Sequence, residues 1–417
     1  MSTYVIVGNS IAAVGCIEGI RQIDAAGRIT VVSREPYPVY GRPLISYLLQ
    51  GKTDEARMAY RGADFYEKNG AEVLYGVTAT AVDADAGTVA LSDGGTLAYD
   101  RLLLATGSRA LVPPFAGLET VEKRFSFMTL GDAKALAAAL TPQTRTLIVG
   151  AGLIGLKCAE GIRARCASVT VCDLADHVLP SVLDAPAAAL VQEHLEQSGI
   201  DFCLGDSVER FSKNTATLKS GRTLPFDLLV VAVGVRPETA LAVSAGAEVA
   251  RGIVTDLHCE TTREHIYAAG DCAQCRDLLT GESRMLALLP NAYMAGSCAG
   301  INMAGGDAVF DTALAMNAVG FFGLHTLTAG VYDGEVYRQQ TQDGFKELFY
   351  KDDRLRGFIL IGDVAGAGIY TALLRERTPL SQIDFERIKQ HPQLMAFDGG
   401  ARAYRLNEQP AGKAAAI

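Results

Sequence analysis

The chain has 417 residues, more than one hydrophobic core supports, so at least two domains are expected. Hydrophobic residues make up 49% and charged residues 20%, which excludes a disordered chain. A formal net charge of -9 argues against nucleic-acid binding, and the absence of a long uncharged apolar run argues against a membrane span. The chain opens without a secretory signal pattern, and its nine cysteines indicate reduced thiols, so a cytoplasmic protein is expected.

One strand–turn–helix–strand pattern occurs twice along the chain. In the first copy, a strand at 4–7 leads through Gly8-Asn9-Ser10 into a helix over about 11–23 and a strand at 29–32. The second copy has strands at 147–149 and 169–171, joined by Gly150-Ala151-Gly152 and a helix over about 153–165. Such continuous apolar strands are typical of parallel sheets covered by helices on both faces. The pattern predicts two Rossmann-type units.

The remaining segments predict smaller antiparallel elements. Residues 71–100 and 201–227 alternate apolar and polar positions between turns, as in small antiparallel meanders. Near the end, strands at 345–350 and 354–361 form a predicted hairpin turned at Asp352-Asp353, followed by a helix over about 364–377 and a frayed tail at 411–417. The prediction is an α/β chain with two Rossmann-type dinucleotide-binding domains and a C-terminal α+β domain. The expected boundaries are 1–112 and 239–310 for the first, 113–238 for the second and 311–417 for the third.

The first glycine turn departs from the G-x-G-x-x-G/A pattern. Gly8 and Ala13 keep their places, but Ser10 replaces the second glycine, which normally lets the backbone approach a pyrophosphate. Serine keeps a small side chain there and offers a hydroxyl donor. Alone, the turn is equally compatible with an ordinary strand-to-helix connection.

The second glycine turn is complete, with Gly150, Gly152 and Gly155 around Leu153 and Ile154. Asp173 ends the following strand, where a carboxylate accepts hydrogen bonds from the adenosine ribose and repels a 2′-phosphate. The pattern predicts an NAD(H) site rather than an NADP(H) site. A glycine turn that serves only helix–strand packing is the alternative.

Two distant strands end in further small-residue turns, Ala105-Thr106-Gly107 and Gly270-Asp271. With the glycine turns, they make the chain resemble the two-dinucleotide-domain flavoproteins. The resemblance implies that the first of these turns packs on FAD, that Asp271 binds a ribityl hydroxyl, and that Gly234 closes the NAD domain. A helix N-cap is the alternative for Asp271. These proteins usually place a glutamate for the adenosine ribose about where Ser33 stands here, and Glu35 is the nearest carboxylate.

The string Tyr40-Gly41-Arg42-Pro43-Leu44-Ile45-Ser46 resembles the flavin domains of rubredoxin, ferredoxin and nitrite reductases. The resemblance places Arg42 and Pro43 at the flavin site. Two positions depart from it: Tyr47 stands where relatives often have lysine, and Lys157 where they commonly have glutamate near the nicotinamide. A surface position is favoured for Lys157; pairing with a carboxylate or orienting the nicotinamide are the alternatives.

The sequence holds no evident route for electrons beyond the flavin. Residues 36–47 contain no cysteine, so a thiol relay is not expected, and Cys272 and Cys275 are interpreted as buried thiols. No run of four clustered cysteines predicts an iron–sulfur centre, and no metal site is expected. Hydride transfer from NADH to FAD needs orientation rather than an acid–base group, so no catalytic side chain is assigned.

The segments GNSIAAVG and YGRPLISYLLQGK are similar to those of NADH-binding flavoprotein subunits of anaerobic 2-oxoacid oxidoreductases of the phenylglyoxylate type. This resemblance implies an FAD-dependent NADH:acceptor oxidoreductase that passes single electrons to an iron–sulfur protein or subunit. It would work in a multi-subunit complex or as a homo-oligomer. The alternatives are a stand-alone NADH oxidase or NADH:rubredoxin reductase, and a flavin-binding assembly or sensor subunit without turnover.

Overall fold

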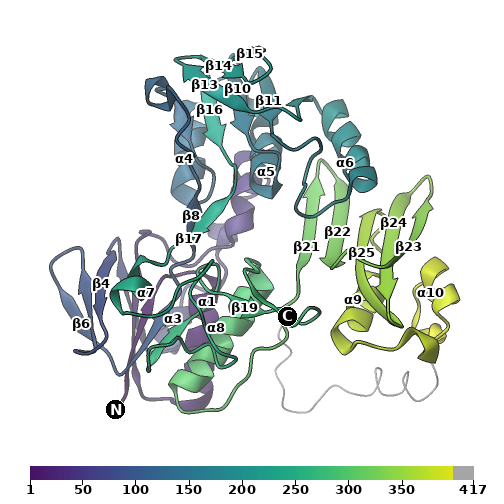
Figure 1. Ribbon diagram of the computed structural model, residues 1–417. Coiled ribbons are helices and arrows are strands. Elements are labelled where there is room, and N and C mark those ends of the chain that lie inside the picture. Colours follow the sequence, from purple (N-terminus) through teal and green to yellow (C-terminus); the bar gives the residue numbers. More distant parts are fainter. Residues whose placement is uncertain (398–417) are drawn as a thin grey trace.

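A computed structural model describes residues 1–397 as three units, each built around a five-stranded sheet (Figure 1). We call these sheets the N-terminal, central and C-terminal sheets. The tail predicted to fray, 411–417, lies outside the described residues. Within 1–397, no helix is both long and apolar enough to cross a membrane.

The N-terminal sheet is parallel throughout, because its strands come from strand–helix–strand connections and a late return of the chain. Fully buried Ile6 and Leu103 show how its central strands are covered on both faces. Its strands, in spatial order, are β18 (Ile266–Ala268), β7 (Arg101–Leu104), β1 (Thr3–Val7), β2 (Arg28–Ser33) and β3 (Ala71–Tyr75). The prediction that residues 71–75 belong to the meander is therefore wrong. An edge strand is partly exposed on one face, so its residues alternate as those of a meander strand do.

Helices α1 (Ile11–Ile23) and α8 (Leu289–Met303) cover one face of this sheet and pack closely on each other. Glycines at the contact make this approach possible: a Cβ on Gly296 would lie 2.0 Å from the Ala12 carbonyl oxygen, and one on Gly15 would lie 2.3 Å from the Tyr293 oxygen. The opposite face is covered by α7 (Ala240–Ser244) and the meander of β4 (Ala79–Asp83), β5 (Thr88–Leu91) and β6 (Thr96–Ala98).

The central sheet repeats the parallel arrangement. Its strands are β12 (Ile200–Cys203), β11 (Ser168–Cys172), β10 (Arg145–Val149), β16 (Leu228–Val231) and β9 (Arg124–Phe125). The helices around it are α4 (Leu130–Ala139), α5 (Leu153–Ile162), with a 3₁₀ turn over Arg163–Arg165, and α6 (Ala185–Gln197). The meander is β13 (Val208–Ser212), β14 (Thr215–Leu218) and β15 (Thr223–Pro225). Residues 201–203, predicted as part of that meander, instead belong to β12, which pairs in parallel with β11 at the sheet edge. That prediction is wrong for the same reason as the one for β3.

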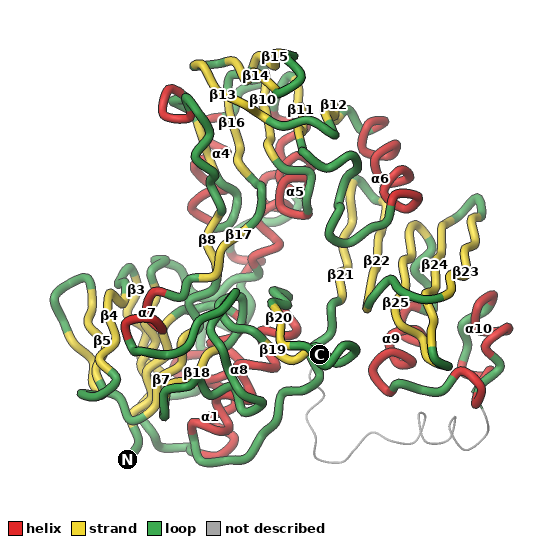
Figure 2. Tube along the Cα trace, viewed as in Figure 1, coloured by secondary structure: helices red, strands yellow, loops and turns green. Residues whose placement is uncertain are grey.

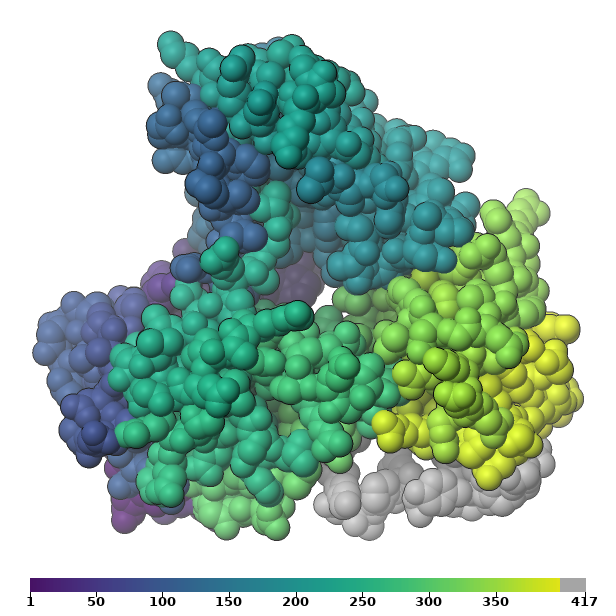
Figure 3. Space-filling view, viewed as in Figure 1, coloured from purple at the N-terminus to yellow at the C-terminus, as the bar shows by residue number. Residues whose placement is uncertain are grey.

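The central unit joins the N-terminal unit through one antiparallel strand pair (Figure 2). The chain enters through β8 (Ser108–Ala110) and returns through β17 (Val235–Pro237), with Ser108 opposite Pro237. A notch separates the two units on the face shown in Figure 3. The N-terminal unit is thus made of two stretches of chain on either side of the central unit.

The C-terminal sheet is antiparallel, as predicted for the final α+β part. Asp352 and Asp353 both have positive φ, +50° and +58°, as a two-residue type I′ hairpin turn requires, so the predicted hairpin is confirmed. The strands in order are β21 (Met316–Phe321), β22 (Leu324–Gly330), β25 (Arg354–Gly362), β24 (Gly344–Lys351) and β23 (Glu335–Gln340). Helices α9 (Ala367–Glu376) and α10 (Phe385–Gln390) follow.

Candidate functional site

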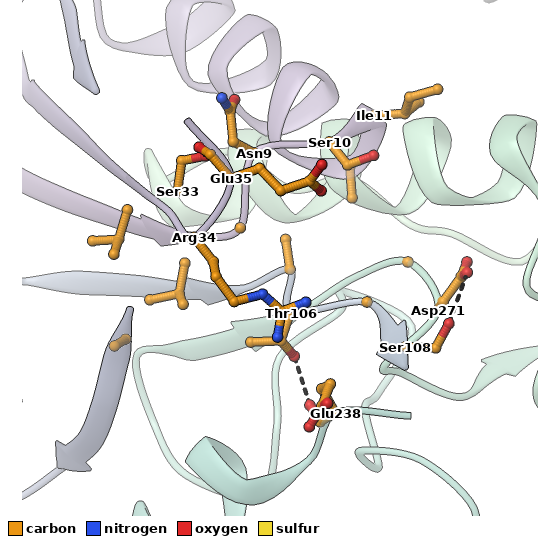
Figure 4. Close-up of a pocket in the computed structure, with 18 of the residues that line it drawn as sticks. Asn9, Ser10, Ile11, Ser33, Arg34, Glu35, Thr106, Ser108, Glu238 and Asp271 are labelled. Carbon is orange, nitrogen blue, oxygen red and sulfur yellow. Dashed lines mark hydrogen bonds between the residues drawn. The ribbon is translucent and has the colours of Figure 1, made fainter. Parts of the chain in front are cut away.

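An elongated cavity opens at the carboxyl ends of the strands of the N-terminal sheet, where ligands of open α/β sheets bind (Figure 4). Most residues predicted for the first nucleotide site line it: Gly8, Ser10, Glu35, Arg42, Ala105, Thr106, Gly107, Gly270 and Asp271. Ala13, fully buried in α1, and Pro43 do not line this cavity. Three of the turns that the sequence analysis singled out, those at Gly8, Ala105 and Gly270, therefore meet at one place.

The turn at Gly8 brings the N-terminus of α1 to the cavity. Gly8 has φ +113°, and a Cβ there would lie 2.1 Å from the Ala105 oxygen, so only glycine fits. Ser10 precedes α1 without a side-chain capping bond. The first backbone N–H groups of a 13-residue helix thus face the cavity without a side-chain cap, an arrangement suited to an anion.

A network of charged and polar side chains continues from this helix end. Arg42 donates from Nε to Ser10 Oγ at 3.3 Å and forms an ion pair with Glu35. The Glu35 carboxylate also accepts from the Tyr40 hydroxyl at 2.7 Å. Burial raises the pKa of Tyr40, so this phenol stays protonated and donates. One carboxylate oxygen of Glu35 thus pairs with Arg42, and the other accepts from Tyr40.

Asp271 also lines the cavity, close enough to Arg42 for the two charges to interact. It accepts a 3.4 Å hydrogen bond from the Ser108 hydroxyl (Figure 4). Burial raises the pKa of the Asp271 carboxyl, and the positive charge of Arg42 opposes that rise. No helix begins after Asp271, since the chain continues through a turn to β19 (Cys275–Arg276), so the N-cap alternative is wrong.

Several residues that line the cavity were not predicted. Asn9 lies inside the first glycine turn; its Oδ1 accepts from the Tyr66 hydroxyl at 2.6 Å, and its buried Nδ2 has no partner among the described residues. Arg34, next to the predicted Glu35, extends into the cavity (Figure 4). Residues 77–80 and Glu238, whose backbone oxygen accepts from the Thr106 hydroxyl at 2.6 Å, carry no motif. Only the folded chain brings these last residues to the cavity.

The second predicted site lies at the carboxyl edge of the central sheet, after β10, β11 and β16. Gly150 has φ +120°, and a Cβ there would lie 2.2 Å from the Ala232 oxygen, so it makes the tight turn. A Cβ on Gly155 would lie 1.9 Å from the Gly150 oxygen, so it permits helix–strand contact. A Cβ on Gly152 or Gly234 would meet nothing within 4 Å, which leaves open space beside both backbones. This division of roles among the three turn glycines is the one that a dinucleotide site requires.

Asp173 closes this edge of the central sheet. Its Oδ2 accepts from the Ala151 N–H at 2.6 Å and its Oδ1 from the Ala175 N–H at 2.8 Å. The carboxylate is therefore held beside the glycine turn by two backbone donors. Leu153 and Ile154 begin α5 on the other side of that turn.

The prediction that Lys157 lies on the surface is wrong. Its side chain is 16% exposed and forms an ion pair with Glu160, whose side chain is 3% exposed. Pairing with another carboxylate was the alternative that the sequence left open. The sequence favoured a surface position because it does not show which face of the helix is covered. In the fold, other units cover the face that carries Lys157 and Glu160, which lie one turn apart on the same helix.

Neither Cys272 nor Cys275 lines the cavity. Cys272 is fully buried, and its Sγ lies 3.3 Å from the Leu104 oxygen; Cys275 is half-buried. The residues that line the cavity in the described part of the chain include no cysteine. Within residues 1–397, no group of three metal-ligating side chains is assembled either.

Comparison with known proteins matches residues 2–296 to the pyridine nucleotide-disulphide oxidoreductase family. The chain is 34% identical over 393 residues to the epsilon subunit of NADH-dependent phenylglyoxylate dehydrogenase from Aromatoleum evansii, covering 91% of this chain and 93% of that subunit. It is 33% identical over 294 residues to rubredoxin–NAD(+) reductase from Pseudomonas putida, covering 69% of this chain and 76% of that one. The covalent putidaredoxin reductase–putidaredoxin complex has a similar structure, with a TM-score of 0.86 and 26% identity over 94% of this chain and 96% of that chain.

Proposed function

The chain belongs to the pyridine nucleotide-disulphide oxidoreductase family and is an FAD-dependent NAD(H) oxidoreductase, and from that premise we propose that it is the NAD-linked electron-transfer subunit of a 2-oxoacid oxidoreductase complex of the phenylglyoxylate type. The observation that carries the proposal is the length of the match. The similarity to the epsilon subunit runs through 93% of that protein and includes the C-terminal sheet.

The cavity of the N-terminal unit is suited to FAD. The uncapped start of α1 and the Arg42 guanidinium supply donors and positive charge for a pyrophosphate. The Asp271 carboxylate is an acceptor for ribityl hydroxyls, and the unpartnered Nδ2 of Asn9 is a donor for a bound polar group. We assign Ala105, Thr106 and Gly107 to the wall beside the flavin, and Ser33, Arg34 and Glu35 to the adenosine end.

The edge of the central sheet is suited to NAD(H). The open space beside Gly152 and Gly234 leaves room for a pyrophosphate and the nicotinamide arm. The Asp173 carboxylate, fixed by two backbone donors, is an acceptor for the adenosine ribose hydroxyls and repels a 2′-phosphate. We infer from this that NADH is the preferred coenzyme.

The chemistry that bound FAD supplies is acceptance of a hydride from NADH and release of electrons one at a time. The part of this chain is orientation: the glycine turns would hold the two pyrophosphates, and the Asp173 and Asp271 carboxylates would bind the sugar hydroxyls. No side chain of residues 1–397 that lines the cavity is a thiol, so a dithiol relay has no donor there. We therefore propose an external single-electron acceptor, an iron–sulfur protein or subunit.

The test is a gentle purification from the native source, followed by identification of co-purifying subunits and iron analysis. We expect iron-containing partners. We also expect the isolated chain to reduce one-electron dyes with NADH but not to oxidise a 2-oxoacid until those partners are added.

Three outcomes would overturn this assignment. Recovery as an iron-free homo-oligomer that consumes oxygen rapidly would make the chain an NADH oxidase. Fast reduction of rubredoxin without other subunits would make it a rubredoxin reductase. Failure of NADH to bleach the oxidised flavin band would leave a flavin-binding assembly or sensor subunit.

A further inference from the structure

Lys157 lies where the three units of the molecule meet. Its ammonium lies 4.8 Å from the ring centroid of Tyr47, in helix α2 (Ile45–Leu49) of the N-terminal unit, and 5.5 Å from that of Phe321, at the end of β21. Lys157 itself belongs to α5 of the central unit. The two positions at which the sequence departs from its relatives, Tyr47 and Lys157, are therefore in contact.

Hydrogen bonds extend this contact into the C-terminal unit. The Lys157 ammonium donates to the Gly320 oxygen at 3.0 Å and pairs with Glu160. The Glu160 Oε1 in turn accepts from the backbone N–H of Phe322 at 2.8 Å. Phe322 has φ +47°, a strained backbone for a bulky residue, and its N–H bond to Glu160 helps to hold that conformation.

The same helix packs closely on the N-terminal unit. A Cβ on Gly161 of α5 would lie 3.3 Å from the Leu49 Cβ and 3.3 Å from the Ser46 oxygen, so glycine brings α5 against α2. Tyr47 then covers the ammonium one turn away. Attraction between a cation and an aromatic ring strengthens when the cation is shielded from water, so the ring helps to hold the ammonium in place.

Lys157 is also near the coenzyme turn. Lys157 lies five positions after Gly152 in the sequence. Because a helix rises about 1.5 Å per residue, the backbone of Lys157 is within about 8 Å of the glycine turn to which we assign the pyrophosphate. Any shift of α5 relative to α2 would shift that turn relative to the flavin cavity.

From these contacts we propose that Lys157 is a positioning residue for hydride transfer. Through Tyr47, Glu160 and the Gly320 carbonyl, it fixes the NAD-binding helix against the FAD-binding unit and the C-terminal sheet. A buried ion pair contributes little net stability but favours one arrangement of its neighbours. We therefore expect Lys157 to affect the alignment of the two nucleotides. A displacement of about an ångström between reacting groups lowers the rate by up to about a hundredfold.

The test compares Lys157→Met, which keeps length and loses charge, with Lys157→Arg, which keeps the cation. Anaerobic stopped-flow reduction by NADH gives the limiting rate and the NADH affinity separately. We expect Lys157→Met to lower the limiting rate at least about tenfold with a much smaller change in affinity, and Lys157→Arg to restore most of the rate. Hydrogen exchange at the Phe322 amide should accelerate in Lys157→Met, in the absence of any nucleotide.

A double variant separates positioning from simple loss of stability. In Lys157→Met, Glu160 is left as a buried carboxylate without its cation, which is destabilising in itself. The double variant Lys157→Met/Glu160→Gln lacks that carboxylate; its limiting rate should stay low even though the unpaired charge is gone. It also provides a folded sample if the single variant unfolds.

The control is Lys219→Met, which removes an exposed lysine from the same unit. It should match the parent in rate, affinity and exchange. The proposal is overturned if Lys157→Met retains flavin, reduces it at the parent limiting rate and leaves Phe322 exchange unchanged. It is equally overturned if only the thermal unfolding temperature falls.

Discussion

At the scale of single residues, the two aspartates Asp173 and Asp271 have different environments. Asp173 is held in place by backbone N–H groups at the edge of the central sheet, whereas Asp271 is half-buried in the cavity with one hydroxyl donor, Ser108. The Asp173 carboxylate is thus fixed beside the second glycine turn, and the Asp271 carboxylate can accept further hydrogen bonds. Their substitutions should affect different ligands.

Replacing Asp173 by Ala should weaken NADH binding and reduce the preference over NADPH, because both the ribose acceptor and the charge that repels a 2′-phosphate are lost. Asp173→Asn is the matched variant: it keeps an acceptor for one backbone N–H but loses the charge. We expect the asparagine variant to gain NADPH use while retaining more NADH affinity than the alanine variant. The concentration dependence of flavin reduction by each coenzyme measures both effects. Equal use of NADPH by the parent protein would contradict this assignment.

Asp271→Ala should yield protein partly depleted of FAD. A hydrogen bond to a charged group is worth about 1.5–3 kcal/mol, which corresponds to a loss of FAD affinity of roughly 10- to 150-fold. Asp271→Asn keeps an acceptor and should retain more flavin. The ratio of flavin to protein after gel filtration measures this difference. Full occupancy and unchanged FAD affinity in the alanine variant would show that Asp271 does not hold the cofactor.

At the scale of elements, the contact between α1 and α8 depends on glycines in both helices. Gly296→Ala places a methyl group 2.0 Å from the Ala12 oxygen, so the helices must separate. We expect a loss of about 1–3 kcal/mol in stability, measured as a lower thermal unfolding midpoint. Gly131→Ala, at an exposed position of α4, is the control: its methyl group would meet only Thr129 Oγ1 at 3.6 Å. Alanine favours helix there by up to about 1 kcal/mol, so the midpoint should rise. An unchanged unfolding midpoint in Gly296→Ala would show that the two helices separate without loss of stability.

The sequence predicted these elements to different degrees. Both glycine turns and their helices carry local signals, since the apolar periodicity and the positions of Gly8 and Gly150 are local properties. The parallel edge strands β3 and β12 were mistaken for meander strands, because alternation reports one exposed face and not the pairing partner. Within the site, segments after strand ends were predictable. Residues 77–80 and Glu238 were not, since they reach the cavity only through the fold of distant segments.

At the scale of the whole molecule, a cluster of charged side chains joins the C-terminal sheet to the central unit. Glu347 in β24 has a fully buried side chain paired with Arg338 of β23, whose guanidinium also lies 3.7 Å from Asp184, the residue that caps α6. Nearby, the Tyr332 hydroxyl donates to the Val182 oxygen at 2.7 Å. The contact between these two units therefore contains an ionisable group without access to water.

Burial raises the pKa of Glu347 from 4.5 to about 6. The folded protein thus holds this proton more tightly than the unfolded chain, so the associated stability is present below pH 4.5 and is lost as the pH rises through about 6. Glu347→Gln removes the titration and keeps an acceptor for Arg338. Relative to the parent, this variant should gain stability between pH 5 and pH 7, by about 2 kcal/mol at most.

Thermal unfolding followed by circular dichroism across that pH range measures the difference between the two proteins. Asp85→Asn, which removes an exposed carboxylate paired with Arg263 at the surface, is the control and should show no such divergence. A constant offset between Glu347→Gln and the parent from pH 4.5 to pH 8 would mean that Glu347 stays ionised throughout.

Because β8 and β17 form an antiparallel pair, the central unit, to which we assign NAD(H), can be exchanged as one block. Its entry and exit strands are hydrogen-bonded neighbours, about 4.8 Å apart, so a segment cut between Arg109 and Arg236 begins and ends at almost the same point. A related segment with a different coenzyme preference can be spliced in at that point without a linker, in the way that domains are inserted at closely spaced ends. Such a graft would inherit its coenzyme from the donor and its flavin from the recipient. The contacts of this unit with the rest of the molecule would have to be kept, and the partner for Tyr47 is among them, so a successful chimera would carry Lys157 or a matched substitute at that contact.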